Sequence, residues 1–290
     1  YSPEAWLASE SFVENVSRNI NASGQLRWDT PIKGLSLTGK AGVTYWTKYD
    51  KTYRAETYFD ENKTVGPSTL NIWTSNNTNT ILEALVNYEK TFGSHDLKVL
   101  AGTSVEQTSN KGLEGYRNTF PNNALYQLGA GDASTATNNS SLEEYALVSF
   151  FGRVNYAFKD KYLLEANLRY DGSSRFAKDN RWGIFPSVSA GWRISEENFW
   201  KKTRAGEVVN NLKLRASYGV LGNQNIGVYP YQQTYDLDHN YPLGNPATLV
   251  PGTYVSTYRN QDLTWEKTAI TNVGLDFGLF NNTLNGSIEY

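Results

Sequence analysis

The chain has 290 residues and a formal net charge of −2 at pH 7, which is too small to indicate binding to nucleic acid or another polyanion. It contains no Cys, so disulfide frameworks, thiol chemistry and zinc sites with Cys ligands are excluded. It also contains no Met and no signal peptide at its start, and we therefore expect an internal piece of a longer protein.

Ten segments in which apolar and polar residues alternate predict β-strands. Residues 162–170 show the pattern most clearly, because Leu164 and Leu168 share one face of a strand while Glu165 and Arg169 share the other. The second face is too charged for the core of a soluble protein, so the pattern favours a membrane β-barrel with lipid outside and water inside. The strands are expected near residues 20–30, 35–50, 79–91, 97–109, 144–158, 162–176, 182–194, 212–222, 265–280 and 283–290.

Short and long links alternate between these strands. Short hairpin links are expected at 31–34, 92–96, 159–161 and 281–282, where Gly, Asn and Asp suit tight turns. Long polar links are expected at 51–78, 110–143 and 223–264. Outer-membrane barrels have this asymmetry, with short periplasmic turns and long outer loops. Two links break the alternation, a short one near 177–181 and a long one at 195–211, where a turn of helix is expected at 195–200.

The predicted fold class is all-β, an antiparallel transmembrane β-barrel that is only partly contained in this chain. A spanning helix needs about 20 apolar residues, and the apolar runs here are much shorter, whereas a barrel strand needs only about 10 residues. Large transporter barrels have about 22 strands and a plugged lumen. We therefore expect residues 1–290 to be part of a single barrel domain, with the plug domain and the C-terminal strands outside the sequence.

Enzyme and metal chemistry find little support. His95 in a tight turn and His239 in a long loop are expected to be solvated, and so are the acidic pairs at 143–144 and 196–197. Residues 236–240 imitate the start of a calcium loop, but Tyr241 and Ala247 stand where an EF-hand requires Gly and an acidic residue. We expect no catalytic residue, no cofactor and no EF-hand, and a looser calcium site in this loop is left open.

Aromatic residues crowd two of the long links. A flat ring with a polar handle suits the C–H face of a sugar or a peptide side chain, and packing between loops is the alternative explanation. The candidate substrate-binding residues are Tyr116, Phe120, Tyr126, Tyr229, Tyr231, Tyr235 and Tyr241. The strand residues interpreted as anchors at the membrane interfaces are Trp28, Trp46, Trp182, Trp192 and Trp265.

Several runs resemble the SusC/RagA family of TonB-dependent outer-membrane transporters of the Bacteroidetes. They are RYDGSSRF at 169–176, RWGIFPSVSAGWRISEE at 181–197, NLKLRASYG at 211–219 and LTWEKT at 263–268. These runs lie within residues 145–290, in the order in which the family shows them, and residues 1–144 fit by general pattern. The run at 169–176 is interpreted as a turn at the barrel rim, with Arg175 paired to a carboxylate.

The resemblance implies energised import of a large nutrient, an oligosaccharide or a peptide, across the outer membrane. In that family a plug fills the barrel, a separate segment contacts the TonB energising complex, and a SusD-like surface lipoprotein covers the outer face. Loops and lumen would contact the cargo, outer-membrane lipid would surround the wall, and no covalent chemistry is expected. The alternatives are a passive porin or a siderophore-type receptor for a metal chelate, and less favourably a soluble carbohydrate-binding β-protein.

Overall fold

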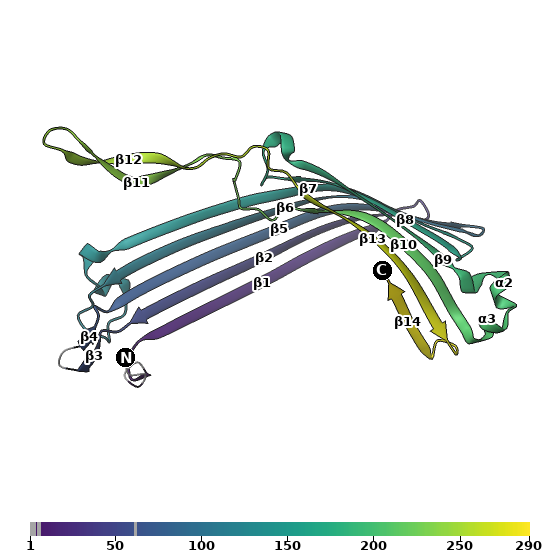
Figure 1. Ribbon diagram of the computed structural model, residues 1–290, viewed down its shortest axis with the longest axis horizontal. Helices are drawn as coiled ribbons and strands as arrows, with labels where there is room; N and C mark the ends of the chain where they lie inside the picture. Colours follow the sequence, from purple (N-terminus) through teal and green to yellow (C-terminus); the bar gives the residue numbers. More distant parts are fainter. Residues whose placement is uncertain (1–3, 5–6, 61–62) are drawn as a thin grey trace. The chain divides into compact units, whose positions relative to one another are not determined.

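The computed structural model describes residues 4, 7–60 and 63–290, and its main feature is a sheet of ten strands (Figure 1). The strand order is β1-β2-β5-β6-β7-β8-β9-β10-β13-β14, and the pairs from β7 to β14 are antiparallel. The all-β fold and the ten predicted strands are confirmed in the predicted order. Their bounds are β1 (Phe12–Asp29), β2 (Leu35–Arg54), β5 (Thr69–Phe92), β6 (His95–Asn118), β7 (Thr137–Phe158), β8 (Tyr162–Ser173), β9 (Trp182–Arg193), β10 (Val209–Asn223), β13 (Glu266–Leu279) and β14 (Leu284–Glu289).

The register of the sheet keeps the predicted faces aligned from strand to strand. Leu164 on β8 lies opposite Tyr156 on β7 and Ala190 on β9. Its neighbour Glu165 lies opposite Asn155 and Ser189. Because successive side chains point to opposite faces, apolar and polar rows cross the sheet on separate sides.

Five strands, β1, β2, β5, β6 and β7, begin or end well beyond the predicted bounds and shorten the expected loops. The added residues carry polar side chains on both faces, which hides the alternation from a reading of the sequence. Across β5 and β6 these side chains bond one another, as in Asn71 to Glu114 at 2.7 Å and Ser75 to Asn110 at 3.0 Å. Cross-strand pairs of this kind stabilise a sheet without an apolar face.

Two of the expected loops contain a hairpin that the sequence pattern did not predict. The link after β2 contains β3 (Thr57–Asp60) and β4 (Lys63–Val65), and the link after β10 contains β11 (Thr234–Leu243) and β12 (Thr248–Thr257). The four predicted short links are confirmed. Gly34, Gly93 and Asn281 in these turns have φ of 87°, 61° and 56°, the left-handed conformation that Gly and Asn tolerate.

The link between β9 and β10 contains helical turns instead of a tight hairpin. They are η4 (Ile194–Glu196), α2 (Asn198–Lys201) and α3 (Arg204–Val208), so the predicted turn at 195–200 is confirmed and α3 was missed. The remaining short helices are η1 (Leu128–Ala130), η2 (Ala133–Thr135) and η3 (Lys178–Asn180). Among the described residues, no helix is long and apolar enough to cross a membrane.

The chain divides into two compact units, each with a small core of its own. Unit 1 comprises residues 1–24, 41–81 and 107–144, and unit 2 comprises residues 25–40, 82–106 and 145–290. The buried apolar side chains of unit 1 are Tyr53, Ala55, Leu70 and Phe120. Those of unit 2 are Phe176, Phe185 and Trp265. The cores are small because most apolar side chains of the sheet stay exposed.

Candidate functional site on the polar face of the sheet

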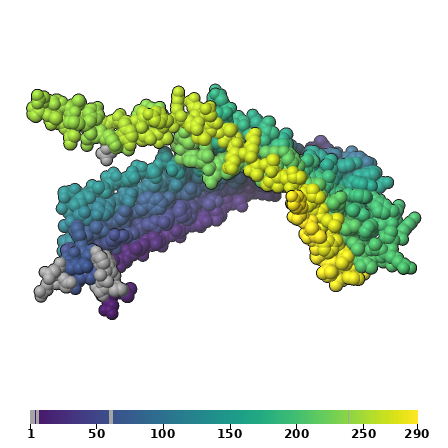
Figure 2. Space-filling model, in the orientation of Figure 1, coloured from purple at the N-terminus to yellow at the C-terminus, as the bar shows by residue number. Residues whose placement is uncertain are grey.

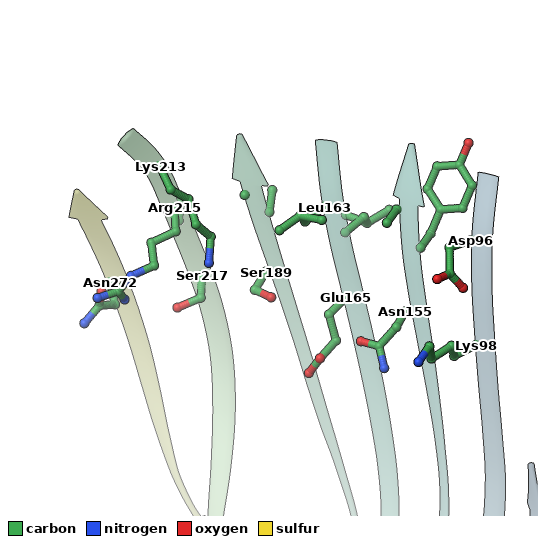
Figure 3. A pocket seen from close by; sticks show the side chains of 16 residues that line it. Asp96, Lys98, Asn155, Leu163, Glu165, Ser189, Lys213, Arg215, Ser217 and Asn272 are labelled. Carbon is green, nitrogen blue, oxygen red and sulfur yellow. The ribbon is translucent and has the colours of Figure 1, made fainter. Parts of the chain in front are cut away.

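A hollow of about 460 Å³ lies on unit 2 and is lined by residues from six neighbouring strands, β6 to β10 and β13 (Figure 3). Its polar lining mixes both signs of charge with neutral hydrogen-bonding groups. These side chains are Asp96, Lys98, Asn155, Glu165, Ser189, Lys213, Arg215, Ser217 and Asn272.

The centre of the hollow is a single row of the sheet. Asn155 on β7 lies opposite Glu165 on β8, which lies opposite Ser189 on β9. Ser189 in turn lies opposite Ser217 on β10, and Ser217 lies opposite Asn272 on β13. The row therefore presents five polar side chains on one face without an apolar interruption. Groups of this kind can bond water or a polar solute.

Ion pairs surround Arg215 at one side of the hollow. Its Nε lies 3.2 Å from Asp276 Oδ1, its Nη2 pairs with Glu289, and Lys213 Nζ lies 3.9 Å from Asp276 Oδ2. Gly274 leaves the space for this guanidinium, because a Cβ there would lie 2.8 Å from Arg215 Cζ. These pairs are partly exposed, so they hold side chains in place more than they stabilise the fold.

The same face continues as a hydrogen-bonded network beyond the hollow. Arg153 Nε donates to Asn167 Oδ1 at 2.7 Å, and Asn167 Nδ2 donates to Glu165 Oε1 at 2.8 Å. Farther along β8, Arg169 pairs with Asp171 at 3.0 Å. A face with so many charges fits a surface that meets water, as the alternation predicted.

The opposite face of unit 2 is apolar and exposed. Leu164, Leu168 and Ile184 have exposed fractions of 48%, 53% and 53%. Val188 lies opposite Tyr218 in the register, and both are exposed as well. Soluble monomers rarely expose apolar patches of this extent, whereas the outside of a membrane barrel requires them.

Two of the Trp residues interpreted as interfacial anchors are exposed, as an anchor requires. They are Trp28 at 58% and Trp182 at 41% exposure. The interpretation of Trp265 is wrong, because this residue is 7% exposed and packs between Phe176 and Phe185. Its Nε1 donates to the carbonyl oxygen of Arg181 at 2.9 Å. Trp265 is therefore a core residue.

In the acidic pair at 196–197, Glu196 is 44% exposed as expected, whereas Glu197 belongs to a structural network and is not solvated. Glu197 accepts from Lys161 Nζ at 2.9 Å, from Tyr162 Oη at 2.7 Å and from Trp192 Nε1 at 3.3 Å. These donors lower the pKa of Glu197 from its usual value to about 2, first through Tyr162 and then through Lys161. Glu197 thus fixes α2 to the turn between β7 and β8.

Three of the predicted substrate-binding aromatics belong to unit 1. Phe120 is buried against Tyr53, with ring centroids 5.7 Å apart, and Tyr126 packs on Tyr53 and Phe12 at 5.8 and 5.1 Å. Tyr116 lies near the end of β6, where its hydroxyl accepts from Asn118 Nδ2 at 3.4 Å. The structure thus gathers Phe120 and Tyr126 around one buried ring and keeps Tyr126 41% exposed.

The other four predicted aromatics belong to unit 2. Tyr229 and Tyr231 precede β11, whereas Tyr235 and Tyr241 lie on it. Tyr235 and Tyr241 are 59% and 49% exposed. The ring of Tyr241 covers Gly252 on β12, where a Cβ would lie 2.1 Å from it. Tyr235 is therefore the most exposed of these four tyrosines.

Three further expectations concern Arg175, His95 and metal binding. Arg175 lies 4.1 Å from the ring centroid of Tyr145 and donates to the carbonyl of Ile226, so its expected pairing with a carboxylate is wrong. His95 is not a solvated loop residue, because it stacks on Phe92 and contacts Tyr156 at 2.6 Å. Within the described part of the chain, no cluster of three or more His, Cys, Asp or Glu is placed to hold a metal ion.

None of the five residues of the polar row was predicted from the sequence to bind a ligand. Each one stands at a polar position of its own alternating segment, so the signal was present. What the sequence lacks is the register that places these positions side by side. The tight turn at 159–161 fixes that register for β7 and β8, but the long links from β9 to β10 and from β10 to β13 do not.

Comparison with known proteins identifies the class. A family model described as "TonB dependent receptor-like, beta-barrel" matches residues 2–290. The chain is 38% identical over 212 residues to TonB-dependent receptor SusC of Bacteroides thetaiotaomicron, covering 70% of this chain and 20% of that protein. It is 37% identical over 216 residues to TonB-dependent receptor P3 of Formosa agariphila, covering 74% of this chain and 21% of that protein.

A solved structure gives the same result. The structure of the RagAB peptide transporter matches with a TM-score of 0.87 and 28% identity, covering 99% of this chain and 31% of that chain. The chain therefore belongs to the family of TonB-dependent receptor β-barrels. Within that family it is of the SusC/RagA type, as the resemblance in residues 145–290 implied. The chain spans about a fifth of the length of the curated relatives named above.

Proposed function

We propose that this chain forms part of the wall of a SusC/RagA-type transporter in the cell outer membrane. The apolar face of the sheet contacts lipid and the polar face lines the aqueous lumen. The transporter imports a large nutrient, an oligosaccharide or a peptide, with energy from the TonB complex and with a SusD-like surface lipoprotein as partner. The chain supplies wall and loops and performs no covalent chemistry.

The observation that carries the proposal is the pair of opposite faces on one sheet. Leu168 on the apolar side is 53% exposed, and its neighbour Asn167 on the polar side belongs to a network of charged groups. A soluble carbohydrate-binding protein would need to bury one of these faces, which unit 2 does not do. The 38% identity to SusC and the RagAB likeness favour this transporter type over a passive porin.

The cargo would meet two kinds of surface on this chain. The polar row with Arg215 and Lys213 offers hydrogen bonds and charge in the lumen. The loop aromatics offer flat apolar faces, and Tyr235 on β11 and Tyr126 after β6 are the exposed members described above. Both surfaces suit an oligosaccharide, with its hydroxyls and C–H faces, and also a peptide.

A deletion strain tests the transport function directly. The gene for the full-length protein is deleted, and growth is measured on a panel of oligosaccharides and of peptides as sole nutrients. We expect loss of growth on members of one class and restoration by the intact gene. Normal growth on every member of both classes, with the protein expressed in the parent strain, would contradict nutrient import.

The aromatic candidates are tested in the same strain. We expect Tyr235→Ala and Tyr241→Ala to raise the nutrient concentration that gives half-maximal growth, because stacking contacts between these rings and the nutrient would be lost. Tyr218→Ala, which removes an exposed ring from the apolar face, is the matched control and should leave that concentration unchanged. Equal effects of all three variants would remove the loop aromatics from the binding surface.

A further inference from the structure

The end of unit 2 that carries the short turns has a row of aromatic side chains. His95 lies between Phe92 and Phe158, with ring centroids 5.1 and 4.8 Å away. Phe158 is followed by Tyr162 across the tight turn, with their rings 6.3 Å apart. Phe92 and Tyr162 are 45% and 46% exposed. The row therefore remains open to its surroundings.

The row continues onto the link between β9 and β10. Tyr162 lies opposite Trp192 in the register, and Phe199 of α2 lies 6.5 Å from the Trp192 ring. Phe199 is 57% exposed although it is a large apolar residue. We call the whole row the aromatic band, which consists of Phe92, His95, Phe158, Tyr162, Trp192 and Phe199.

Three cations without an ion pair stand beside this band. Lys159 follows Phe158 directly, and its Nζ lies 5.2 Å from the Phe158 ring centroid. Lys202 lies between α2 and α3, Arg204 is the first residue of α3, and both are exposed. None of the three has a salt bridge to a described residue. We call them the basic rim.

The other charges of these two segments mostly neutralise one another. Lys161 pairs with Glu197 at 2.9 Å and Lys201 pairs with Glu196 at 2.6 Å. Arg193 donates to the backbone oxygen of Asp160 at 3.3 Å. Residues 158–162 and 193–208 together hold six basic and four acidic side chains, the unpaired carboxylates being Asp160 and Glu207, so their net charge is +2.

Hydrogen bonds between neighbouring segments hold the aromatic band and the basic rim in place. Glu197 connects α2 to the start of β8 through Lys161 and Tyr162, and Trp200 Nε1 donates to the oxygen of Val209 at 3.1 Å. The amide of Phe280 donates to the oxygen of Val208 at 2.9 Å, so the turn after β13 lies against α3. Figure 2 shows these segments, in green and yellow, side by side on the surface.

This combination matches the chemistry of a phospholipid surface. Aromatic side chains are favoured at the boundary between acyl chains and headgroups, and Lys and Arg reach from that boundary to headgroup phosphates. An anionic headgroup gains from each such cation, whereas a zwitterionic headgroup carries an ammonium that cancels part of the attraction. A net charge of +2 beside exposed rings therefore favours an anionic phospholipid.

We propose that the aromatic band and the basic rim form a binding surface for anionic phospholipid at the short-turn end of the barrel wall. The rings lie in the membrane interface, and Lys159, Lys202 and Arg204 bind the headgroup phosphates. The inference rests on the membrane location proposed above. It adds a lipid preference at one end of the wall to the transport function.

Photocrosslinking with full-length protein in vesicles tests this surface. The vesicles contain phosphatidylcholine and phosphatidylglycerol in equal amounts, and either lipid carries the photoactivatable acyl chain. The readout is the ratio of phosphatidylglycerol to phosphatidylcholine crosslinks on the peptide 193–208. We expect the triple variant K159Q/K202Q/R204Q to lower this ratio at least about fivefold, the effect of one cation near a lipid surface. The control variant K178Q/R259Q/K267Q removes the same charge from exposed positions outside the rim and should keep the ratio.

The possible results distinguish failure of the lipid-binding surface from failure of the transporter proposal. An unchanged ratio in the rim variant, or an equal loss in the control variant, overturns the lipid-binding surface while leaving the transporter proposal intact. Absence of crosslinks from either lipid to the apolar face of 162–170 means that the sheet is not in the membrane, and it overturns both. Selective loss in the rim variant, with crosslinks to 162–170 unchanged, supports the lipid-binding surface.

Discussion

Replacing Trp265 by Ala tests whether the small core of unit 2 holds the long loop before β13 in place. Trp265 is 7% exposed, its ring lies 5.3 Å from Phe176 and 5.1 Å from Phe185, and its Nε1 donates to the oxygen of Arg181. Removing a buried Trp costs about 3–5 kcal/mol in well-packed cores. Because about 1.4 kcal/mol corresponds to a factor of ten, local opening should become at least about a hundredfold more frequent.

The assay is amide hydrogen exchange of the segment 173–183 in the full-length protein. The amide of Ser173 donates to the oxygen of Arg181 at 3.1 Å, so its protection reports whether the cluster is intact. Trp265→Phe keeps most of the ring and removes one hydrogen bond, and we expect it to cost about 1 kcal/mol. Trp182→Ala removes a Trp that is 41% exposed and serves as the matched control. Equal exchange in W265A and wild type would refute the assignment of Trp265 to a stabilising core.

Three further predictions concern the sheet and its turn end. Glu197 has a lowered folded-state pKa, so its contribution to stability is present above the unfolded pKa and is lost as the pH falls toward about 2. Hydrogen-exchange protection of residues 194–208 should therefore persist down to about pH 4 and decrease below it, and E197Q should abolish that transition. Leu168→Arg should cost about 2–4 kcal/mol in urea unfolding from lipid vesicles, whereas Ser217→Arg on the polar face should cost much less, and equal costs would contradict the assignment of faces. Gly274→Val should displace the Arg215 guanidinium and cost about 1 kcal/mol, with Gly274→Ala intermediate, and wild-type stability of both would show that the arginine does not need this space.

Strong alternation made the centre of each strand predictable from the sequence. In β8 every outward position from Tyr162 to Tyr170 is apolar, and the structure pairs each one with an outward position of β7. The short turns were predictable as well, because Gly34 and Asn281 adopt the left-handed backbone that these residue types tolerate. Local chemistry decides both features, so no knowledge of the rest of the fold was required.

The strand ends were not predictable in the same way. The first part of β5 carries Asn71 and Ser75, whose partners Glu114 and Asn110 lie about forty residues away on β6. A reading of one segment at a time sees many polar residues on both faces and assigns a loop. The hairpin of β11 and β12 was missed because Pro242 in β11, and Pro251 with Gly252 in β12, suggest irregular chain.

The site was only partly predictable. Sequence reasoning found the loop aromatics and the charged face, but it could not distinguish a ring that packs from a ring that is displayed. Phe120 is buried beside Leu70, whereas Tyr235 is 59% exposed, although both stand in polar, aromatic-rich stretches. That difference depends on contacts between distant segments. The contact of these residues with cargo stays a prediction, and so does the assignment of residues 1–290 to a single barrel domain.

A cysteine scan of β8 tests whether one face of the sheet lies in lipid and the other in water. Residues 1–290 contain no Cys, so single Cys substitutions at positions 163 to 169 each provide one label site once any Cys elsewhere in the full-length protein is replaced. The full-length proteins are spin-labelled in vesicles, and collision rates are measured with oxygen, which concentrates in lipid, and with a water-soluble nickel chelate. We expect a period of two, with positions 164, 166 and 168 accessible to oxygen and positions 165, 167 and 169 accessible to the nickel chelate. Equal access of the nickel chelate to all positions would contradict a sheet with one face in lipid.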